Sequence, residues 1–464
     1  MNKLFLVLGL AAMVCGALLA DSPSASGLTL QEAREEALQT YWGVKIAQEE
    51  VTAAVAERKS RFADFFPQLV FGTNYSHYND ETDFLIAKGA VAKTPIPFPT
   101  KDTFLPWLNQ NTYQYGPSLQ QPLFLGGRLY FGYRQAQSQE EQAGWDKKKA
   151  VNDLLFEVEQ AYLNTLQLQG EAAVMEESLK FYKQHREDLE QKFKAGRVAI
   201  VDVLKAEAEE AKTEEELLSV NSDLKVAEGQ FNLLLGRKVN AVVSLEPLPD
   251  PTPVTIDLDT AWNLAKSYRP DVQEAIAGLR AAGFSKQVVE SSYFPQVNFT
   301  AKWYGQEGSP SNIEKERWQL LLTADWNLWE WGSTSQQVEK AAAQQRGAQD
   351  QAFLLADQAN LDVYQAWLQL QAADVRIEVL GKKKTHAKEV VRVTDLGFKA
   401  GVTTSSDLMA AENMLSQVEI DEVKARFGAR LARAAFHHAI GIMDEKLAVS
   451  NAAPPTESST TPRP

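Results

Sequence analysis

The sequence predicts a mainly α-helical chain with a smaller β part, built as two tandem copies of one unit. Three observations lead to this prediction. A short motif and its surroundings recur at a fixed distance along the chain. Apolar residues keep the spacing of a helix over long stretches of each copy, and four short segments alternate apolar with polar residues instead. A repeat of this length favours one duplicated unit over two unrelated domains.

The internal repeat is clearest at residues 193–196, which read Phe-Lys-Ala-Gly and recur at 398–401, 205 positions later. The same offset relates Phe231 to Phe436, so the register holds far from the motif. The repeat and its flanks predict five segments. They are a signal peptide over 1–20, a first copy over 21–244, a proline-rich linker over 245–255, a second copy over 256–447 and a disordered tail over 448–464.

The N-terminus has the layout of a secretory signal peptide, because Lys3 precedes a continuous apolar run that ends near Ala20. The mature chain is therefore expected to be exported. Cys15 is the single cysteine and lies inside this run, so disulfides are not expected. Lipidation of Cys15 stays open, although Val14 stands where a bacterial lipoprotein signal has a small residue. No other run approaches the roughly 20 apolar residues of a spanning helix, so any membrane crossing would use a β-barrel.

Long helical hairpins are predicted over about 127–236 in the first copy and about 332–441 in the second. Apolar or small residues recur there at spacings of three and four, which is the seam of a coiled coil. In the first copy this seam comprises Val151, Leu154, Val158, Ala161, Thr165, Leu168, Ala172, Met175, Leu179, Tyr182, Leu189 and Phe193. A helix from residue 127 to 193 would be roughly 100 Å long, too long for an ordinary globular domain. Residues 30–65 and 258–293 each predict one further helical element.

Four segments predict β-strands, because their apolar and polar residues alternate with a period of two. They span about 68–78, 113–123, 296–304 and 317–329. Their lengths suit tilted strands that cross a membrane. Aromatic residues stand near the strand ends as in an interfacial girdle, namely Trp303, Trp318, Trp326 and Trp329.

Two interpretations of these strands are open from their pattern alone. They could form two ordinary amphipathic hairpins on a soluble core. The duplicated copies, the very long helices and the signal peptide favour a membrane barrel instead. Four strands cannot close a barrel, since about eight is the smallest number that does. Several protomers must then share one barrel, and three of them would give twelve strands and leave an open lumen.

With this order of elements, the chain resembles the TolC-like outer-membrane efflux family from residue 28 to about 447. The order helix, strand, strand, long helix and return helix occurs twice, and each tip carries the Phe-Lys-Ala-Gly motif followed by Asp202 or Asp407. The resemblance implies a homotrimer with a shared twelve-stranded transmembrane β-barrel, four strands per protomer, continued by a trimeric α-barrel of the helical hairpins. It also implies a location in the cell outer membrane, with the helical barrel extending into the periplasm.

Members of this family are passive exit ducts, so the resemblance implies no catalytic site and no cofactor. It implies that cargo arrives from an inner-membrane transporter through a periplasmic adaptor protein, in tripartite efflux or in type I secretion. Outer-membrane lipid would surround the barrel. The sequence does not decide between drug, metal and protein as cargo, and it does not identify the pump or the adaptor.

The resemblance also places a periplasmic constriction at the hairpin tips. Asp202 and Asp407 match acidic positions of the family, and three-fold symmetry would turn each into a ring of carboxylates that attracts cations. Each carboxylate could equally cap the start of its return helix. Phe398 and Thr403 stand where the best-known member has latch residues of other types, Tyr and Arg, and Ala410 replaces a second acid. The gate is therefore expected to be held differently.

The turns themselves match the adaptor-docking motif of the family. The six positions are Ala195, Gly196, Arg197, Ala400, Gly401 and Val402. Arg197 departs from the usual Leu, so adaptor choice is expected to differ. The glycines are expected to end their helices in the left-handed conformation in any case.

Other functions find less support in the sequence. A formal net charge of -14 argues against nucleic acid as a partner. No metal-binding spacing, nucleophile elbow or phosphate loop is present, and the five histidines are His77, His185, His386, His437 and His438. The main alternative is an exported periplasmic coiled-coil adaptor or scaffold, which would carry one hairpin instead of two. The first copy also has a longer external loop, residues 79–111, whose conformation the sequence leaves open.

Overall fold

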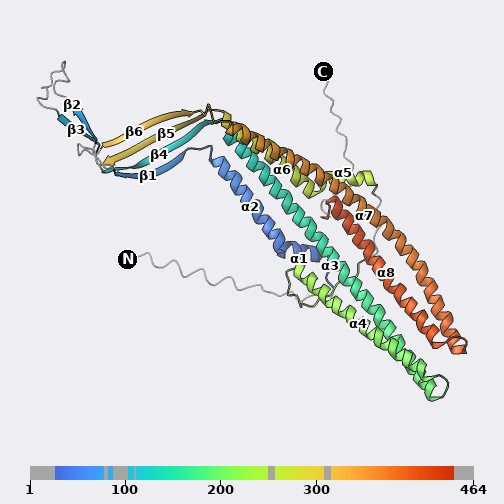
Figure 1. Ribbon diagram of the computed structural model, residues 1–464. Coiled ribbons are helices and arrows are strands. Elements are labelled where there is room, and N and C mark those ends of the chain that lie inside the picture. Colours follow the sequence, from blue (N-terminus) through green and yellow to red (C-terminus); the bar gives the residue numbers. More distant parts are fainter. Residues whose placement is uncertain are drawn as a thin grey trace, which may run out of the picture. The chain divides into compact units, whose positions relative to one another are not determined.

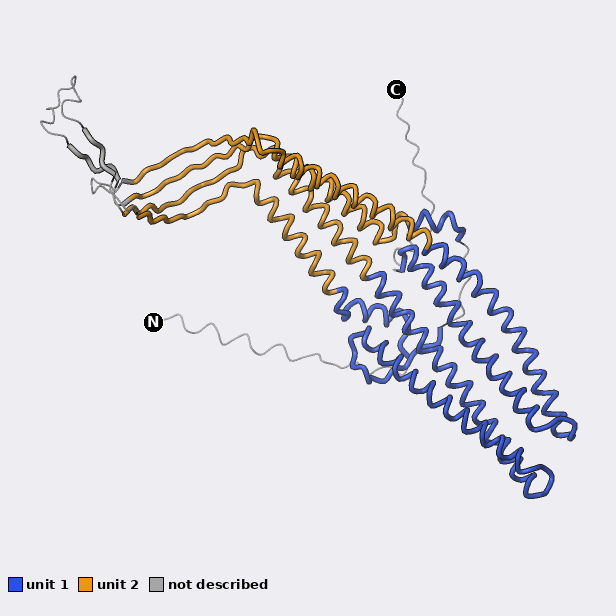
Figure 2. The backbone as a smooth tube through the Cα atoms, viewed as in Figure 1, with its two compact units in different colours: residues 1–44, 151–265, 362–464 blue, residues 45–150, 266–361 orange. Residues whose placement is uncertain are grey.

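The computed structural model describes residues 27–77, 82–86, 103–108, 111–248, 256–307 and 315–443 (Figure 1). The predicted signal peptide with Cys15, most of the external loop 79–111 and the tail 448–464 lie outside these residues, and the linker is described only to residue 248. The chain divides into two compact units (Figure 2). Unit 1 holds residues 1–44, 151–265 and 362–464, and unit 2 holds residues 45–150 and 266–361.

Unit 2 contains a four-stranded antiparallel sheet in the order β1-β4-β5-β6. Its strands are β1 (Gln68–His77), β4 (Asn111–Leu125), β5 (Gln296–Glu307) and β6 (Lys315–Asp325). The two predicted hairpins become one sheet, because β4 of the first copy pairs with β5 of the second. Two short strands, β2 (Thr82–Ile86) and β3 (Thr103–Leu108), pair with each other inside the external loop.

The last strand of the sheet ends at Asp325, earlier than residue 329, where the sequence pattern places its end. Beyond it the chain turns, with Trp331 and Gly332 in the left-handed region at φ 53° and 82°. The backbone N–H of Ser333 donates to the carbonyl of Glu330 at 3.0 Å and closes this turn. Apolar and polar residues keep alternating past Asp325 as far as Leu328, which is why the pattern alone extends the strand too far.

The sheet is incomplete within one chain. Its edge strands β1 and β6 each pair on one side only among the described residues. Leu69 and Phe71 of β1 are 74% and 70% exposed, and Trp318 and Leu322 of β6 are 72% and 64% exposed. Open edges and bare apolar side chains together indicate a surface that another chain or a membrane covers.

Long helices form the two predicted hairpins. They are α3 (Arg128–Lys194) with α4 (Ile200–Leu234), and α7 (Ser333–Ala400) with α8 (Ser405–Ile440). Both α3 and α7 contribute residues to the two units. Of the helices that the structure describes, none is both long enough and apolar enough to cross a membrane.

Each region predicted as one shorter helical element is divided into two helices. The first region contains α1 (Leu30–Thr40) and α2 (Trp42–Ala63), and the second contains α5 (Leu258–Tyr268), α6 (Pro270–Glu290) and the 3-10 turn η1 (Ser291–Tyr293). The second break falls at Arg269, whose φ of -65° and ψ of 118° are extended, because the ring of Pro270 disfavours a helical residue before it. Tyr41 is extended at the equivalent place in the first copy.

Unit 1 buries equivalent positions of the two copies in separate cores. The first core includes Ala33, Ala37, Val158 and Phe231. The second core includes their repeat equivalents Ala261, Ala265, Val363 and Phe436. A third cluster, at the far ends of the hairpins, comprises Tyr182, Leu189, Val203, Ala206 and Met409. This cluster takes residues from both copies and therefore ties the two hairpins together.

Candidate functional site

The far ends of the two hairpins, in unit 1, carry the residues that the sequence singles out. Both turns have the same backbone. Gly196 has φ 73° and Gly401 has φ 76°, the left-handed conformation that glycine adopts without a side-chain clash. The N–H of Arg197 donates to the carbonyl of Lys192 at 2.9 Å, which completes a Schellman motif at the end of α3. Val402 makes the equivalent bond at 2.8 Å at the end of α7.

The six predicted docking positions at these turns are all exposed. The two tips nevertheless present different chemistry. The first carries Arg197 beside an apolar patch in which Val201 and Leu204 are each 54% exposed. The second carries Val402, which is 82% exposed. The tips are therefore distinct surfaces, although their backbones repeat.

The two predicted constriction acids differ in their surroundings. The carboxylate of Asp407 accepts from the N–H of Thr404 at 2.9 Å and from its Oγ1 at 2.7 Å, and the Asp407 N–H donates back to that Oγ1 at 3.1 Å. These bonds form a capping box at the start of α8. The equivalent residue before α4 is Ala199, which has no side-chain oxygen, and Asp202 has no side-chain partner among the described residues. Capping is thus present at Asp407 and absent at Asp202.

The capping box preserves the charge of Asp407. Hydrogen bonds from the side chain of Thr404, and then from its backbone, hold the pKa of Asp407 below its ordinary value. The beginnings of α4 and α8 adjoin, since Lys205 Nζ lies 3.2 Å from Ser406 Oγ. Two carboxylates of one chain, exposed Asp407 and half-buried Asp202, therefore stand on the first turns of adjoining helices.

Phe398 and Thr403 behave differently at the second tip. Thr403 lies in the turn, and its Oγ1 donates to the carbonyl of Thr394 at 2.9 Å, so this side chain folds back onto the end of α7. The ring of Phe398 meets the ring of His185 edge-on at 5.3 Å, and Lys192 Nζ lies 4.3 Å from its centroid. Phe398 therefore joins the end of α7 to α3, whereas Thr403 stays within its own hairpin.

His185 organises the contact between the tips. It is 6% exposed, and its Nε2 lies 2.8 Å from the Oγ of Ser405, at the start of α8. Its ring stacks on Phe181 with centroids 5.7 Å apart. Burial lowers the pKa of His185 below its ordinary value, so the ring is neutral near pH 7. One uncharged side chain thus links α3 to α7 and α8.

The sequence pattern does not predict this role of His185, which shows no metal-binding spacing either. The signal was present, because residue 185 falls on the stripe that Tyr182 and Leu189 define at spacings of three and four. Both of those residues are buried in the tip cluster. A histidine on a coiled-coil seam is a candidate for an interhelical hydrogen bond, but the sequence does not predict which residue is its partner.

A further acidic residue lies behind the tips. Glu412 of α8 has a raised pKa, chiefly because burial disfavours its charge and also because Glu419 and Glu177 are nearby. Carboxyl groups at this end of unit 1 thus extend beyond Asp202 and Asp407, but burial disfavours the charged form of this one.

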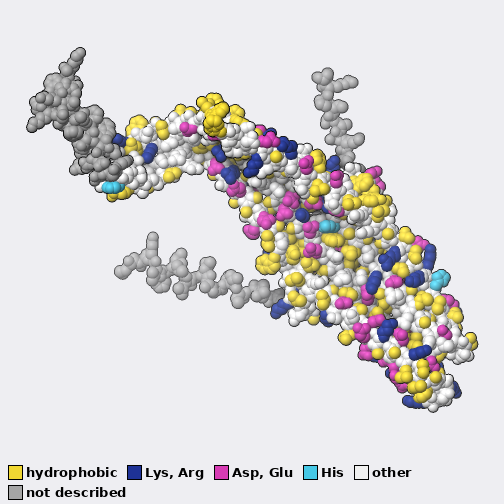
Figure 3. All heavy atoms as spheres, in the orientation of Figure 1, with side chains coloured by type: hydrophobic (Ala, Val, Ile, Leu, Met, Phe, Trp, Pro, Cys, Tyr) yellow, Lys and Arg dark blue, Asp and Glu magenta, His cyan; other side chains and the backbone are white. Residues whose placement is uncertain are grey.

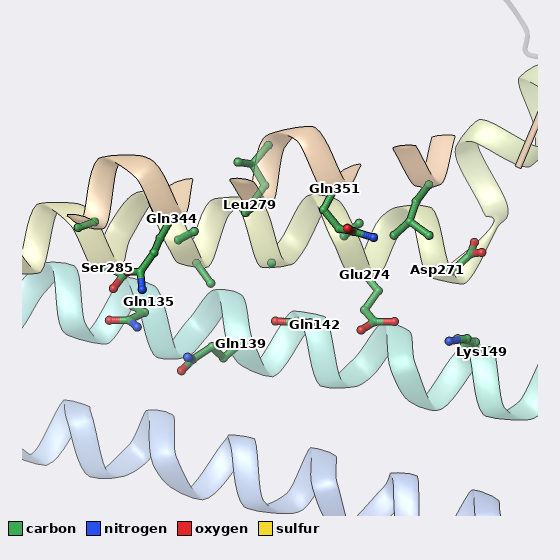
Figure 4. A pocket seen from close by; sticks show the side chains of 17 residues that line it. Gln135, Gln139, Gln142, Lys149, Asp271, Glu274, Leu279, Ser285, Gln344 and Gln351 are labelled. Carbon is green, nitrogen blue, oxygen red and sulfur yellow. The ribbon is translucent and has the colours of Figure 1, made fainter. Parts of the chain in front are cut away.

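A separate hollow of about 620 Å³ lies in unit 2 between α3, α6 and α7 (Figure 4). Amide side chains line much of it, namely Gln135, Gln139, Gln142, Gln344 and Gln351. Glu274 also faces it, and burial together with the charge of Asp146 raises the pKa of Glu274. Across the described residues, no group of three or more His, Cys, Asp and Glu side chains is placed to hold a metal ion. The hollow is a polar seam between helices.

Comparisons with known proteins agree with this architecture. A family model described as Outer membrane efflux protein matches residues 33–237 and 261–441. The chain is 22% identical to the outer membrane efflux protein BepC of Brucella suis biovar 1 over 343 residues, 72% of this chain and 73% of that protein. It is 21% identical to nodulation protein T of Rhizobium leguminosarum bv. trifolii over 334 residues, 68% of this chain and 70% of that protein.

Solved structures share the fold. The outer-membrane channel OprN superposes with a TM-score of 0.76 at 20% identity, over 89% of each chain. The outer membrane protein VceC from Vibrio cholerae superposes with a TM-score of 0.74 at 18% identity, over 89% of this chain and 96% of that one. Because these sequence identities are low, the structural similarity establishes the fold of the chain and not its function.

Proposed function

Because the chain belongs to the outer membrane efflux protein family, we propose that it is the outer-membrane exit duct of a tripartite efflux or type I secretion system. It passively conducts cargo that an inner-membrane transporter delivers through a periplasmic adaptor protein. In this proposal the sheet lies in the cell outer membrane, surrounded by lipid, and the long helices extend into the periplasm.

The observation that carries the proposal is the incomplete sheet of unit 2. Its edges β1 and β6 are open, and Leu320 and Leu322 of β6 are 61% and 64% exposed. Pairing β6 of one copy with β1 of the next would remove both edges. Two copies would give eight strands and a filled interior, whereas three give twelve strands and a lumen. We therefore take the assembly to be a homotrimer.

The longest helix of the second copy supports the same assembly. Apolar side chains along α7 are bare in the single chain, with Phe353, Leu361, Leu368, Val375 and Val379 between 43% and 62% exposed. A helix that exposes such a stripe in water needs a partner to bury it. Neighbouring copies supply that partner when the hairpins close into a helical barrel.

The tips have two roles in this proposal. In a homotrimer Asp202 and Asp407 each become a ring of three carboxylates, which favours cations and repels anions, with Phe398 and Thr403 beside them at the constriction. The exposed turns, residues 195–197 and 400–402, dock the adaptor. Arg197 gives the first turn a positive charge that an acidic adaptor loop would recognise.

Planar-bilayer recordings test conduction directly. The purified protein should pass ions without nucleotide or any other energy source, because a duct only provides a path. Protein that enters the bilayer and still leaves it non-conducting under both voltage polarities would contradict the proposal. An exported adaptor or scaffold, the alternative from the sequence, would remain in the soluble periplasmic fraction instead.

Deletion of the coding sequence separates the two kinds of cargo. In efflux, deletion raises the cellular retention of a fluorescent dye, and expression of the chain in trans restores its export. In type I secretion, a protein normally found in the medium stays in the cells. A deletion strain unchanged in both respects would oppose the proposed role.

A further inference from the structure

The long helices α3 and α7 are equivalent in the repeat, but they do not have equivalent neighbours. In unit 1, α3 packs against α4 and also contacts α8 of the second hairpin (Figure 1). α7 packs against α8. Its other face is bare in the part of the chain that the structure describes, with Val375, Val379 and Val393 between 53% and 62% exposed. One contact that α3 makes is therefore unmade at α7.

The contact between α3 and α8, here called the internal contact, shows what α7 lacks. Ser178 Oγ of α3 and Ser416 Oγ of α8 share a hydrogen bond. Two turns farther from the tips, a Cβ on Gly170 would lie 2.9 Å from Cγ1 of Val423, so the two helices pass very close there. Because the helices are antiparallel, these two places fix their register.

The repeat transfers this register to α7 and α4. Since α4 is the equivalent of α8, the offset of 205 residues turns the internal contact into one between α7 and α4. The pair Gly170 and Val423 becomes Val375 and Leu218, which are 62% and 72% exposed in the single chain. Figure 1 shows α4 and α7 at the two outer edges of this group of helices. The partner of α7 in this register is therefore α4 of another copy.

Charges at the transferred positions change sign. The internal contact brings two acids together, because burial, and then the charges of Glu419 and Glu177, raise the pKa of Glu412 on α8. Where α3 has Glu177, α7 has Lys382, and where α8 has Glu412, α4 has Glu207. Two like charges within the chain thus correspond to opposite charges between α7 and α4.

A second charged place lies farther from the tips. In the internal contact, Lys424 Nζ of α8 is 3.3 Å from Glu171 Oε2 of α3. Arg376 takes the place of Glu171 on α7, and its side chain has no partner among the described residues. The place of Lys424 falls to Ser219, one turn from the exposed acid Glu215. The base has moved to the long helix and the acid to the return helix.

The side chains at the first charged place are available for a partner. Lys382 and Glu207 are both exposed in the single chain. Glu207 has no side-chain partner among the residues described. Lys382 Nζ lies 2.7 Å from Glu378 Oε1 on its own helix, but both side chains are about 70% exposed, and such a surface pair contributes little. Figure 3 shows charged side chains of both signs among hydrophobic ones toward the far ends of the hairpins.

We propose that α7 of one copy packs against α4 of the next in the register of the internal contact, and that a salt bridge from Lys382 to Glu207 joins them. Arg376 and Glu215 form a second salt bridge. This inference rests on the proposed function, which assembles three copies, and it adds which helices meet and which residues pair. The internal contact has no such oppositely charged pair at the place of Lys382, so the charges distinguish the contact between copies from the one within a copy.

Disulfide cross-linking in the outer membrane tests the register. The mature chain is expected to lack cysteine, so Val375→Cys/Leu218→Cys introduces the two thiols alone. After mild oxidation, denatured protein should run as covalent dimers and trimers that a reductant returns to single chains. The matched control is Val375→Cys/Leu204→Cys. Leu204 is also exposed on α4, but it lies about 21 Å along the helix from residue 218, so this variant should stay as single chains.

The failures of the two proposals are distinguishable. If the native particle contains three chains but neither variant cross-links, or both do so equally, this register is wrong while the proposed duct stands. The bare faces would then be open to another partner, such as the adaptor. If the particle does not contain three chains, the proposed function fails as well.

Charge reversal tests the salt bridge separately. Lys382→Glu should lower by several degrees the temperature at which the particle dissociates in detergent at low salt. The loss should shrink at about 1 M salt, where screening acts over a few ångströms. Lys382→Glu/Glu207→Lys restores opposite charges and should recover most of the loss. A double variant no more heat-resistant than Lys382→Glu would overturn this pairing.

Discussion

His185 holds its position at the tips as a neutral ring. Ser405 of α8 and Phe398 of α7 contact it, and the charged groups around it are Asp188 and Lys192 of α3 and Asp395 of α7. Asp188 and Asp395 favour the protonated ring, but burial outweighs them and the net effect lowers the pKa of His185. Protonation therefore places a poorly solvated charge where the two hairpins meet.

Acid should loosen this contact. Because the pKa of His185 is lower in the folded chain than in the unfolded one, the unfolded chain binds more protons between the two values. Stability then rises with pH in that window and is lost as pH falls below the ordinary value of 6.5. Once corrected for the intrinsic exchange rate, which itself falls with pH, the protection of the amides at the start of α8 should decrease between about pH 7.5 and about pH 5.5. His185→Gln should reduce this change, and His386→Gln, at an exposed position of α7, should not.

The tip carboxylates make a separate prediction. Asp202→Asn removes a charge without breaking any side-chain hydrogen bond, and Asp407→Asn removes one from a capping box. If both acids form rings around the path of ions, each change should lower cation selectivity, measured as the reversal potential in a salt gradient. Asp223→Asn, at an exposed position farther along α4, is the control. If the double variant keeps the wild-type reversal potential, neither carboxylate lies on the path of the ions.

At the scale of elements, the two return helices begin differently although they are copies. Thr404 caps α8, and Ala199 stands at the equivalent place before α4 without a side-chain bond. Ala199→Thr should create a second capping box with Asp202 and stabilise the first hairpin by about 1 kcal/mol. Thr404→Ala should cost a similar amount, about 1 kcal/mol, at the second. Unfolding in detergent measures both stability changes. If the first hairpin of the Ala199→Thr variant is no more stable than that of the wild type, residues 199 and 404 are not equivalent as helix caps.

The elements also show what the sequence could predict. Helical periodicity over each long hairpin and the glycine turns are local signals, and the structure has these helices. β4 belongs to the first sequence repeat and β5 to the second, so no local pattern predicts that these two strands pair. The sequence pattern places the end of β6 too late, because the alternation continues past Asp325 as far as Leu328. Capping at Asp407 is one of the two alternatives that the sequence leaves open. The partners of His185 on the second hairpin, Ser405 and Phe398, lie more than 200 residues away in sequence, so no local pattern reveals its role.

At the scale of the whole molecule, two separate features indicate that more than one chain is needed. The sheet has two open edges, and α7 bears a stripe of exposed apolar residues. Neither feature is stable in water by itself, and adding copies around one axis covers both. We therefore propose that a shared barrel completes what one chain leaves unfinished, and this is the central claim about this protein.

Mass determination of the particle extracted from outer membranes in detergent tests that claim most directly. Native mass spectrometry, with the detergent stripped in the instrument, should give three mature chains and no other protein subunit. The particle should dissociate to single chains on heating. A particle of two chains, or a monomer recovered from the soluble periplasm, would contradict the shared twelve-stranded barrel.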